Sequence, residues 1–187
     1  MQLQGKTVLF LGSSVTYGSA AGGVSFADMM AETCGIKMIK EAVSGTTLAD
    51  INDQSYVSRL KKVDRAQQID LFICQLSTND PNAGAPLSET EEAIRFIVEY
   101  VRDTFACPIV FYTGTYFANE KYAEMVELLK RLSREYGFAV LNLWDSQEMR
   151  AVSGEDYKRY MRDPVHPTLE GYREWWLPKF IEICASI

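Results

Sequence analysis

The sequence has few residues able to bind metal ions. It contains one histidine and four cysteines in 187 residues. The cysteines are widely spaced and form no CxxC pair. Zinc sites and disulfide frameworks need clustered thiols or imidazoles, so neither is predicted, and we expect no metal and no cofactor. Reduced, mostly buried thiols are expected at Cys34, Cys74, Cys107 and Cys184.

Long apolar runs and an excess of basic residues are also missing. No stretch approaches the roughly 20 apolar residues that span a bilayer, and the first residues lack the pattern of a secretory signal. The formal net charge is -6 and the basic residues are scattered, which disfavours nucleic-acid binding and attraction to an anionic membrane. We therefore expect a cytoplasmic protein without membrane insertion or a nucleic-acid partner, acting on a neutral, polar small molecule.

What the sequence does have is the composition of a folded domain. Hydrophobic residues make up 47% and charged residues 24% of the chain, which are ordinary values for a globular protein. The length is near the usual range of one domain and no repeat divides the chain, so residues 1–187 are predicted to form a single domain. Short apolar runs alternate with longer amphipathic segments, a rhythm typical of α/β proteins with a parallel sheet.

Five runs are predicted to be strands. Four of them are nearly continuous apolar runs, as expected of strands covered on both faces. The second is more polar, which suggests an edge strand. The five are residues 7–11 (TVLFL), 37–41 (KMIKE), 71–75 (LFICQ), 109–113 (IVFYT) and 139–143 (AVLNL).

Three segments with apolar residues at helical spacing are predicted to be helices. Ser88–Glu91 has the pattern of a capping box and precedes an apolar face that continues to residue 101. Residues 121–136 stop before Gly137, a residue type that often ends helices. Residues 168–187 form a closing helix that Pro178 should kink or divide.

Polar loops follow several of the predicted strands. In open parallel sheets the ligand site lies beyond the carboxyl ends of the strands. The loops at residues 12–18 (GSSVTYG), 42–47 (AVSGTT) and 76–81 (LSTNDP) are rich in hydroxyl, amide and glycine groups, although each alone fits ordinary turn chemistry. Four residues should line a pocket at the same rim or simply cover the edge of the core: Tyr116, Phe117 and Asn119, which follow the fourth strand, and Tyr17, which lies one turn beyond Ser14.

The single histidine, His166, follows Asp163 by three residues in a loop stiffened by two prolines. A lone histidine is usually structural, and this spacing also occurs where a loop enters a helix. The combination with Ser14, in a glycine-bounded turn directly after the first strand, favours chemistry. Acyl transfer needs a nucleophile, a base and a group that orients the base, and these three residues supply them.

These segments resemble the SGNH hydrolase family, also known as GDSL-like esterases and lipases. Its GDSxTxG-like, glycine, GxND and DxxH blocks correspond to residues 12–18, 44–45, 77–80 and 163–166, in that order. The resemblance implies a flavodoxin-like three-layer αβα sandwich with strand order 2-1-3-4-5. It also implies that Ser14, Asp163 and His166 form the catalytic triad, and that Ser14, Gly45 and Asn79 form the oxyanion hole.

Two positions depart from the family pattern. Ser13 replaces the aspartate of the first block and Ser77 replaces the glycine of the third. We expect a changed local network rather than lost catalysis. Ser13 should accept a backbone hydrogen bond in the turn, and Ser77 should narrow the pocket near Asn79. Thr16 and Gly18 align with the first block and favour Ser14 over Ser13 as the nucleophile.

The sequence thus predicts a serine esterase acting on a short-acyl carboxylic ester, such as the acetyl ester of a sugar or another small alcohol. A lysophospholipase or thioesterase acting on longer chains is one alternative. A flavodoxin-like phosphate- or nucleotide-binding protein, with residues 12–14 leading into a helix that cradles an anion, is another. This binding-protein alternative leaves Asp163 and His166 without a role. Gly5–Thr7 resembles the end of a P-loop but precedes the strand instead of following it.

Overall fold

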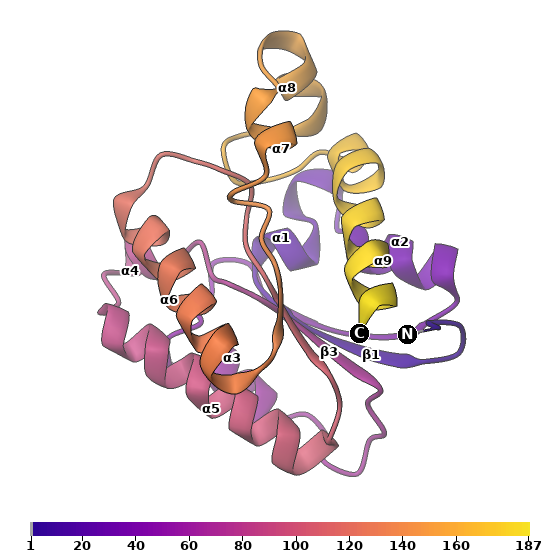
Figure 1. Ribbon diagram of the computed structural model, residues 1–187, viewed down its shortest axis with the longest axis vertical. Coiled ribbons are helices and arrows are strands. Elements are labelled where there is room, and N and C mark those ends of the chain that lie inside the picture. Colours follow the sequence, from indigo (N-terminus) through magenta and orange to yellow (C-terminus); the bar gives the residue numbers. More distant parts are fainter. Residues whose placement is uncertain (1) are drawn as a thin grey trace.

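The computed structural model describes residues 2–187 and contains a five-stranded parallel sheet between two layers of helices (Figure 1). The strand order is β2-β1-β3-β4-β5, and every neighbouring pair is parallel. This confirms the predicted fold class and strand order. The strands are β1 (Thr7–Gly12), β2 (Lys37–Ala42), β3 (Leu71–Gln75), β4 (Ile109–Tyr112) and β5 (Ala139–Leu141).

The helices divide between the two faces of the sheet. In Figure 1, α1, α2 and α9 lie on one side of it and α3, α5 and α6 on the other, while α7 and α8 project at one end. The α-helices are α1 (Ser14–Tyr17), α2 (Phe26–Cys34), α3 (Tyr56–Leu60), α4 (Asp80–Ala83), α5 (Leu87–Phe105), α6 (Glu120–Tyr136), α7 (Gln147–Ala151), α8 (Gly154–Tyr160) and α9 (Leu177–Ser186). A 3-10 helix η1 (Ser19–Ala21) and a π-helix η2 (Gly171–Trp176) complete the order.

The strands lie where the sequence predicted them, with different ends. β2 is an edge strand, as its polar residues indicated. β5 is two residues shorter than predicted because Asn142 leaves the ladder, and its side chain bonds to Asp145 at 2.7 Å. β4 stops before Thr113, whose hydroxyl accepts a hydrogen bond from the backbone N–H of Trp144 at 2.9 Å. Side-chain hydrogen bonds of this kind compete with the hydrogen bonds of the sheet, so a strand ends where they form.

The helix predictions hold except at one terminus. Residue Gly137 ends α6 in the left-handed conformation, as predicted. Pro178 lies in the first turn of α9, directly after the π-helix, but the backbone stays right-handed helical across this junction, so the closing segment changes its hydrogen-bond pattern there without being split. The capping box predicted at Ser88–Glu91 is wrong. α5 begins at Leu87, and the carbonyl of Pro86 accepts the first backbone bonds, so Ser88 already lies inside the helix.

Two hydrophobic cores cover the two faces of the sheet. On one face Phe26 of α2 stacks on Phe180 of α9 with ring centroids 3.8 Å apart and meets Tyr112 of β4 edge-on. Burying one such side chain stabilises the fold by about 1.5–3 kcal/mol. All four cysteines are free, and three of them are buried. Within residues 2–187, no helix is both long and apolar enough to span a bilayer.

Candidate active site

The end of β1 fixes the position of Ser14. The chain turns after Gly12, and Ser14 becomes the first residue of α1. Only glycine fits at position 12, because an added Cβ would lie 1.7 Å from the hydroxyl oxygen of Thr16. That hydroxyl lies 2.9 Å from Oε1 of Gln75 and 2.6 Å from the hydroxyl of Tyr112. These contacts join α1, which begins at Ser14, to strands β3 and β4.

A hydrogen-bonded chain links the two ends of the sequence. Ser14 Oγ lies 2.8 Å from His166 Nε2, and His166 Nδ1 lies 2.8 Å from one carboxylate oxygen of Asp163 and 3.0 Å from the other. Ser14 is 7% exposed, while the ring of His166 is partly open to solvent. In this arrangement an imidazole can take a proton from a hydroxyl while a carboxylate holds its other nitrogen in the protonated form.

The carboxylate of Asp163 is held ionised by its surroundings. Partial burial alone would raise its pKa. Hydrogen bonds from the backbone N–H groups of Val165 and His166, at 2.8 and 2.9 Å, and from the His166 ring outweigh that effect. The pKa of Asp163 is therefore lowered from its ordinary value. These backbone bonds also fix the direction of the carboxylate, and the direction of the ring follows from it.

Backbone N–H groups are available beside Ser14. Among residues 2–187, the backbone N–H groups of Ser14 and Gly45 donate to no protein acceptor. Gly45 adopts a φ of +80°, a conformation that favours glycine. A Cβ there would meet nothing within 4 Å, so glycine is required by the backbone conformation rather than by crowding. Its loop is tied to the end of β1 by a hydrogen bond from Val43 N–H to the Gly12 carbonyl.

Asn79 is anchored next to this loop. Its side-chain Nδ2 donates to the Thr46 carbonyl at 2.8 Å. An amide nitrogen carries two hydrogens, so one remains to donate elsewhere. Because Thr46 follows Gly45, this bond ties the Asn79 amide to the loop that carries Gly45. The structure thus brings Ser14, Gly45 and Asn79 to the same edge of the sheet, as predicted.

The two departures from the family pattern act differently from our expectation. Ser13 does not cap α1, and its side chain accepts no backbone hydrogen bond there. Instead its N–H and its hydroxyl both donate to Oε1 of Gln75, at 2.9 and 3.3 Å. Ser77 is fully buried and does not narrow a pocket. Its hydroxyl accepts from Asn79 N–H at 3.1 Å and donates to the Thr46 carbonyl, which strengthens the anchoring of Asn79.

A buried arginine behind the site was not predicted. Arg59 of α3 is 5% exposed. Its guanidinium donates to the carbonyls of Gly12 and Glu41 at 2.8 and 2.7 Å, and to the hydroxyl of Thr46 at 3.1 Å. No carboxylate of the described chain forms an ion pair with it, and burial lowers its pKa. A sequence signal did exist, because Arg59 lies between the apolar residues of a short helix, where a solvated charge is not expected.

This fold and these residues identify the family. A model of the GDSL-like lipase/acylhydrolase family matches residues 10–174. The chain therefore belongs to the GDSL-like lipase/acylhydrolase family, a family of carboxylic ester hydrolases. No curated protein sequence matches it.

Solved structures with the same fold have low sequence identity to this chain. A Lactobacillus plantarum protein has a TM-score of 0.84 at 17% identity, with 98% of each chain covered. An acetylxylan esterase of Geobacillus stearothermophilus has a TM-score of 0.74 at 18% identity, covering 97% of this chain and 95% of its own. A family two carbohydrate esterase of Clostridium thermocellum, in complex with cellohexaose, has a TM-score of 0.73 at 13% identity, covering 100% of this chain and 66% of its own. At these identities the likeness concerns the fold.

Proposed function

We propose that the protein is a serine esterase in which Ser14 is the nucleophile, His166 the general base and Asp163 the residue that orients it. The observation that carries the proposal is the 2.8 Å contact between Ser14 Oγ and His166 Nε2, two residues 152 positions apart in the chain. Membership of an acylhydrolase family supports it. A phosphate-binding role for the same turn would leave the His166–Asp163 pair without a function.

The reaction proceeds through two acyl-transfer steps. Ser14 Oγ bonds to the ester carbonyl carbon as His166 takes its proton, and the negative charge that forms on the carbonyl oxygen accepts hydrogen bonds from Ser14 N–H, Gly45 N–H and Asn79 Nδ2. The bond to the alcohol oxygen then breaks, and His166 gives its proton to the leaving alcohol. Water attacks the acyl-enzyme by the same route and releases the carboxylic acid.

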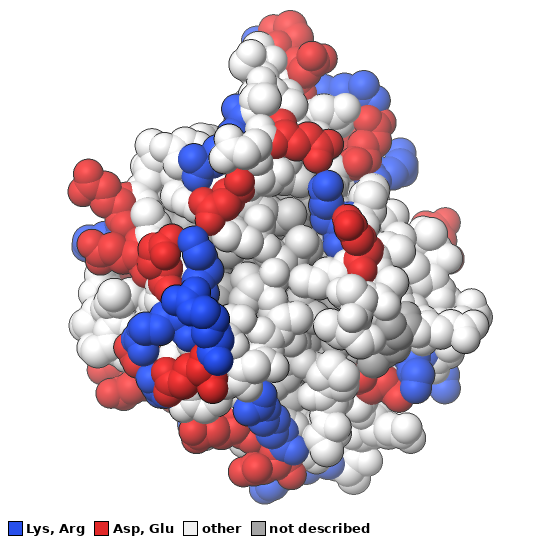
Figure 2. Space-filling view, viewed as in Figure 1, with Lys and Arg blue, Asp and Glu red and all other residues white. Residues whose placement is uncertain are grey.

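The preferred substrate of this site is a short acyl group, such as an acetyl group on a sugar or another small alcohol. The net charge of -6 disfavours an anionic substrate. Figure 2 shows positive and negative side chains interspersed around an uncharged central area on one face of the molecule. Structural neighbours that are named as an acetylxylan esterase and a carbohydrate esterase also support this choice.

A series of p-nitrophenyl esters, from acetate to long chains, tests the acyl preference. We expect kcat/KM to fall steeply with chain length. Rates that peak on long chains would contradict the preference and favour a lysophospholipase or thioesterase. The Ser14→Ala variant is the blank for every ester, and Ser13→Ala is its matched control because the two serines are adjacent. Ser13→Ala should retain activity if Ser14 is the nucleophile.

A further inference from the structure

A cavity of about 410 Å³ lies beyond the carboxyl ends of β4 and β5. This volume is within the range of small-molecule sites. Its lining combines aromatic side chains with polar side chains at the N-terminus of α6. It is lined by Tyr116, Ala118, Asn119, Glu120, Ala123 and Trp144.

The loop that opens this cavity also touches the candidate active site. Gly114 packs against the side chain of Thr78, the residue before Asn79. Thr115 lies against Met161, two residues before Asp163, with its hydroxyl 3.9 Å from the Met161 sulfur. Tyr116 follows directly and is 46% exposed. The loop that leads into the cavity therefore contacts the two segments that carry Asn79 and Asp163.

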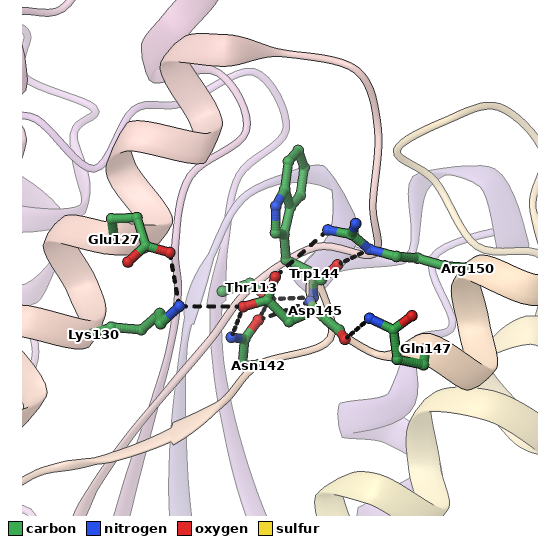
Figure 3. Close-up of polar contacts among 8 residues, drawn as sticks. All are labelled: Thr113, Glu127, Lys130, Asn142, Trp144, Asp145, Gln147 and Arg150. Atoms are coloured by element: carbon green, nitrogen blue, oxygen red, sulfur yellow. Dashed lines mark hydrogen bonds and ion pairs between the residues drawn. The ribbon is translucent and has the colours of Figure 1, made fainter.

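The aromatic side of the cavity is rigidly held. Trp144 N–H donates to the Thr113 hydroxyl, and its carbonyl accepts from Arg150 Nε at 2.9 Å (Figure 3). Figure 3 shows the indole pointing away from this polar cluster. The Arg150 guanidinium also lies 4.1 Å from the centre of the Tyr116 ring. Helix α7, which carries Arg150, thus contacts the Tyr116 ring and the Trp144 backbone, and the two rings pack on each other with centroids 4.9 Å apart. A ring held in place loses less entropy when a ligand binds.

The polar side offers unused hydrogen-bonding groups. Asn119 Oδ1 accepts from Tyr122 N–H at 2.9 Å, which leaves its amide N–H groups free within the described chain. The Glu120 carboxylate likewise has no hydrogen-bond or ion-pair partner in residues 2–187. An amide donor and a carboxylate acceptor facing aromatic rings suit a ligand with several hydroxyl groups and apolar C–H faces. A carboxylate at the rim disfavours an anionic ligand.

We propose that this cavity is the subsite for the alcohol part of the substrate, and that this alcohol is a neutral sugar whose face packs on Tyr116. The assignment rests on the proposed esterase function. The acyl group reacts at Ser14, while the sugar extends toward β5 and bonds to Asn119 and Glu120. The Tyr116 ring sets the affinity for the sugar and takes no part in bond making or breaking.

The test compares two acetate esters that differ only in the alcohol: a methyl glycoside with one O-acetyl group, and methyl acetate. Tyr116→Ala should raise KM for the acetylated glycoside about tenfold, the effect of losing one aromatic contact, with kcat and the hydrolysis of methyl acetate unchanged. Ala118→Trp, at an exposed position, should fill the cavity and have the same selective effect. Leu87→Ala is the control because Leu87 is a 39% exposed apolar residue at the start of α5 that does not line this cavity.

The outcomes separate the subsite from the esterase function. Equal losses on both esters, or no loss on the glycoside in either variant, would overturn the subsite while leaving the esterase intact. A wild-type protein inactive on both esters would overturn the proposed function. Binding of the unacetylated methyl glycoside, followed by ligand-observed NMR, needs no catalysis. Loss of glycoside binding in Ala118→Trp would support the subsite independently of the kinetics. Glycoside binding that is the same in the wild type and in both variants would contradict the subsite.

Discussion

The guanidinium of Arg59 donates a hydrogen bond to the carbonyl of Gly12 at 2.8 Å. The same side chain reaches the Thr46 hydroxyl, which in turn donates to the Val43 carbonyl at 2.7 Å. One buried cation therefore joins the turn before Ser14 to the loop that presents Gly45. We interpret Arg59 as a positioning residue for the proposed oxyanion hole, because it connects two of its donors without contacting the substrate.

Replacing Arg59 should impair turnover more than binding. Arg59→Met keeps much of the side chain's length but removes its bonds, so kcat should fall about 10- to 100-fold, the range expected for a small displacement of reacting groups. KM should stay nearly constant. Arg59→Lys should recover part of kcat, and Thr46→Val, which removes only the hydroxyl link, should give a smaller loss. Steady-state kinetics on a folded Arg59→Met protein with unchanged kcat would contradict this role.

Asn79 provides a second test of the same pocket. Asn79→Ala removes the amide hydrogen left free by the bond to Thr46, and kcat should fall by ~10²–10³, the usual effect of losing one oxyanion donor. Asn79→Asp is a useful comparison, since it is nearly isosteric but places negative charge where the oxyanion forms. The kcat of Asn79→Asp should be at least as low as that of Asn79→Ala. Turnover equal to wild type in the alanine variant would remove Asn79 from the oxyanion pocket.

Asp163→Asn should separate orientation from charge. The asparagine oxygen can keep the backbone bonds from Val165 and His166, which turns its NH₂ group toward His166 Nδ1. The ring proton is then displaced to Nε2, where it faces Ser14 Oγ and prevents proton transfer. We expect kcat to fall about 10⁴-fold, the loss associated with the wrong tautomer, with little change in thermal stability. A large loss of Tm with modest kinetic change would indicate a structural role instead.

Acid should weaken the segment that follows the nucleophile turn. Burial alone would raise the pKa of Asp28, but hydrogen bonds from Lys40 and Ser25 lower it from its ordinary value of 3.8. Because folding lowers the pKa of Asp28, its ionised carboxylate stabilises the folded protein. This stabilisation is complete at pH values above the ordinary pKa and is lost as the pH falls through the pKa of the folded state. Lys40 also donates to the carbonyls of Tyr17 and Gly23. These two hydrogen bonds stabilise the loop between α1 and α2.

Asp28→Asn should therefore cost about 1 kcal/mol of unfolding free energy near neutral pH, the scale of a helix cap and a partly exposed ion pair. The difference from wild type should shrink as pH is lowered. Urea unfolding of both proteins over a pH series measures it. Asp64→Asn, in an exposed loop, is the control and should follow the wild-type curve. A difference that persists unchanged at low pH would contradict the assignment.

The sequence was sufficient for the sheet and for the meeting of the site residues. Apolar runs predicted four of the strands and a more polar run predicted the edge strand β2. Residues after the strand ends were expected to converge because parallel strands point the same way. What the sequence could not supply were features that depend on contacts distant along the chain. The bonds of Arg59 to Gly12 and Glu41 depend on how α3 packs against the sheet.

The ends of elements were also hard to predict. The capping-box pattern at Ser88 was overridden by Pro86, whose extended conformation starts α5 two residues earlier. The expected cap by Ser13 failed because Gln75, 62 residues away, offers its Oε1 to both the N–H and the hydroxyl. Local patterns identify the residue types, while their partners are chosen by tertiary packing.

The most direct measurement of the central proposal is labelling with a fluorophosphonate, followed by mass spectrometry of the peptide that contains Ser13 and Ser14. We expect one adduct per chain, on Ser14, absent from Ser14→Ala, retained in Ser13→Ala, and strongly slowed in His166→Ala. An adduct on Ser13, or labelling that survives Ser14→Ala, would contradict the assignment of Ser14 as the nucleophile.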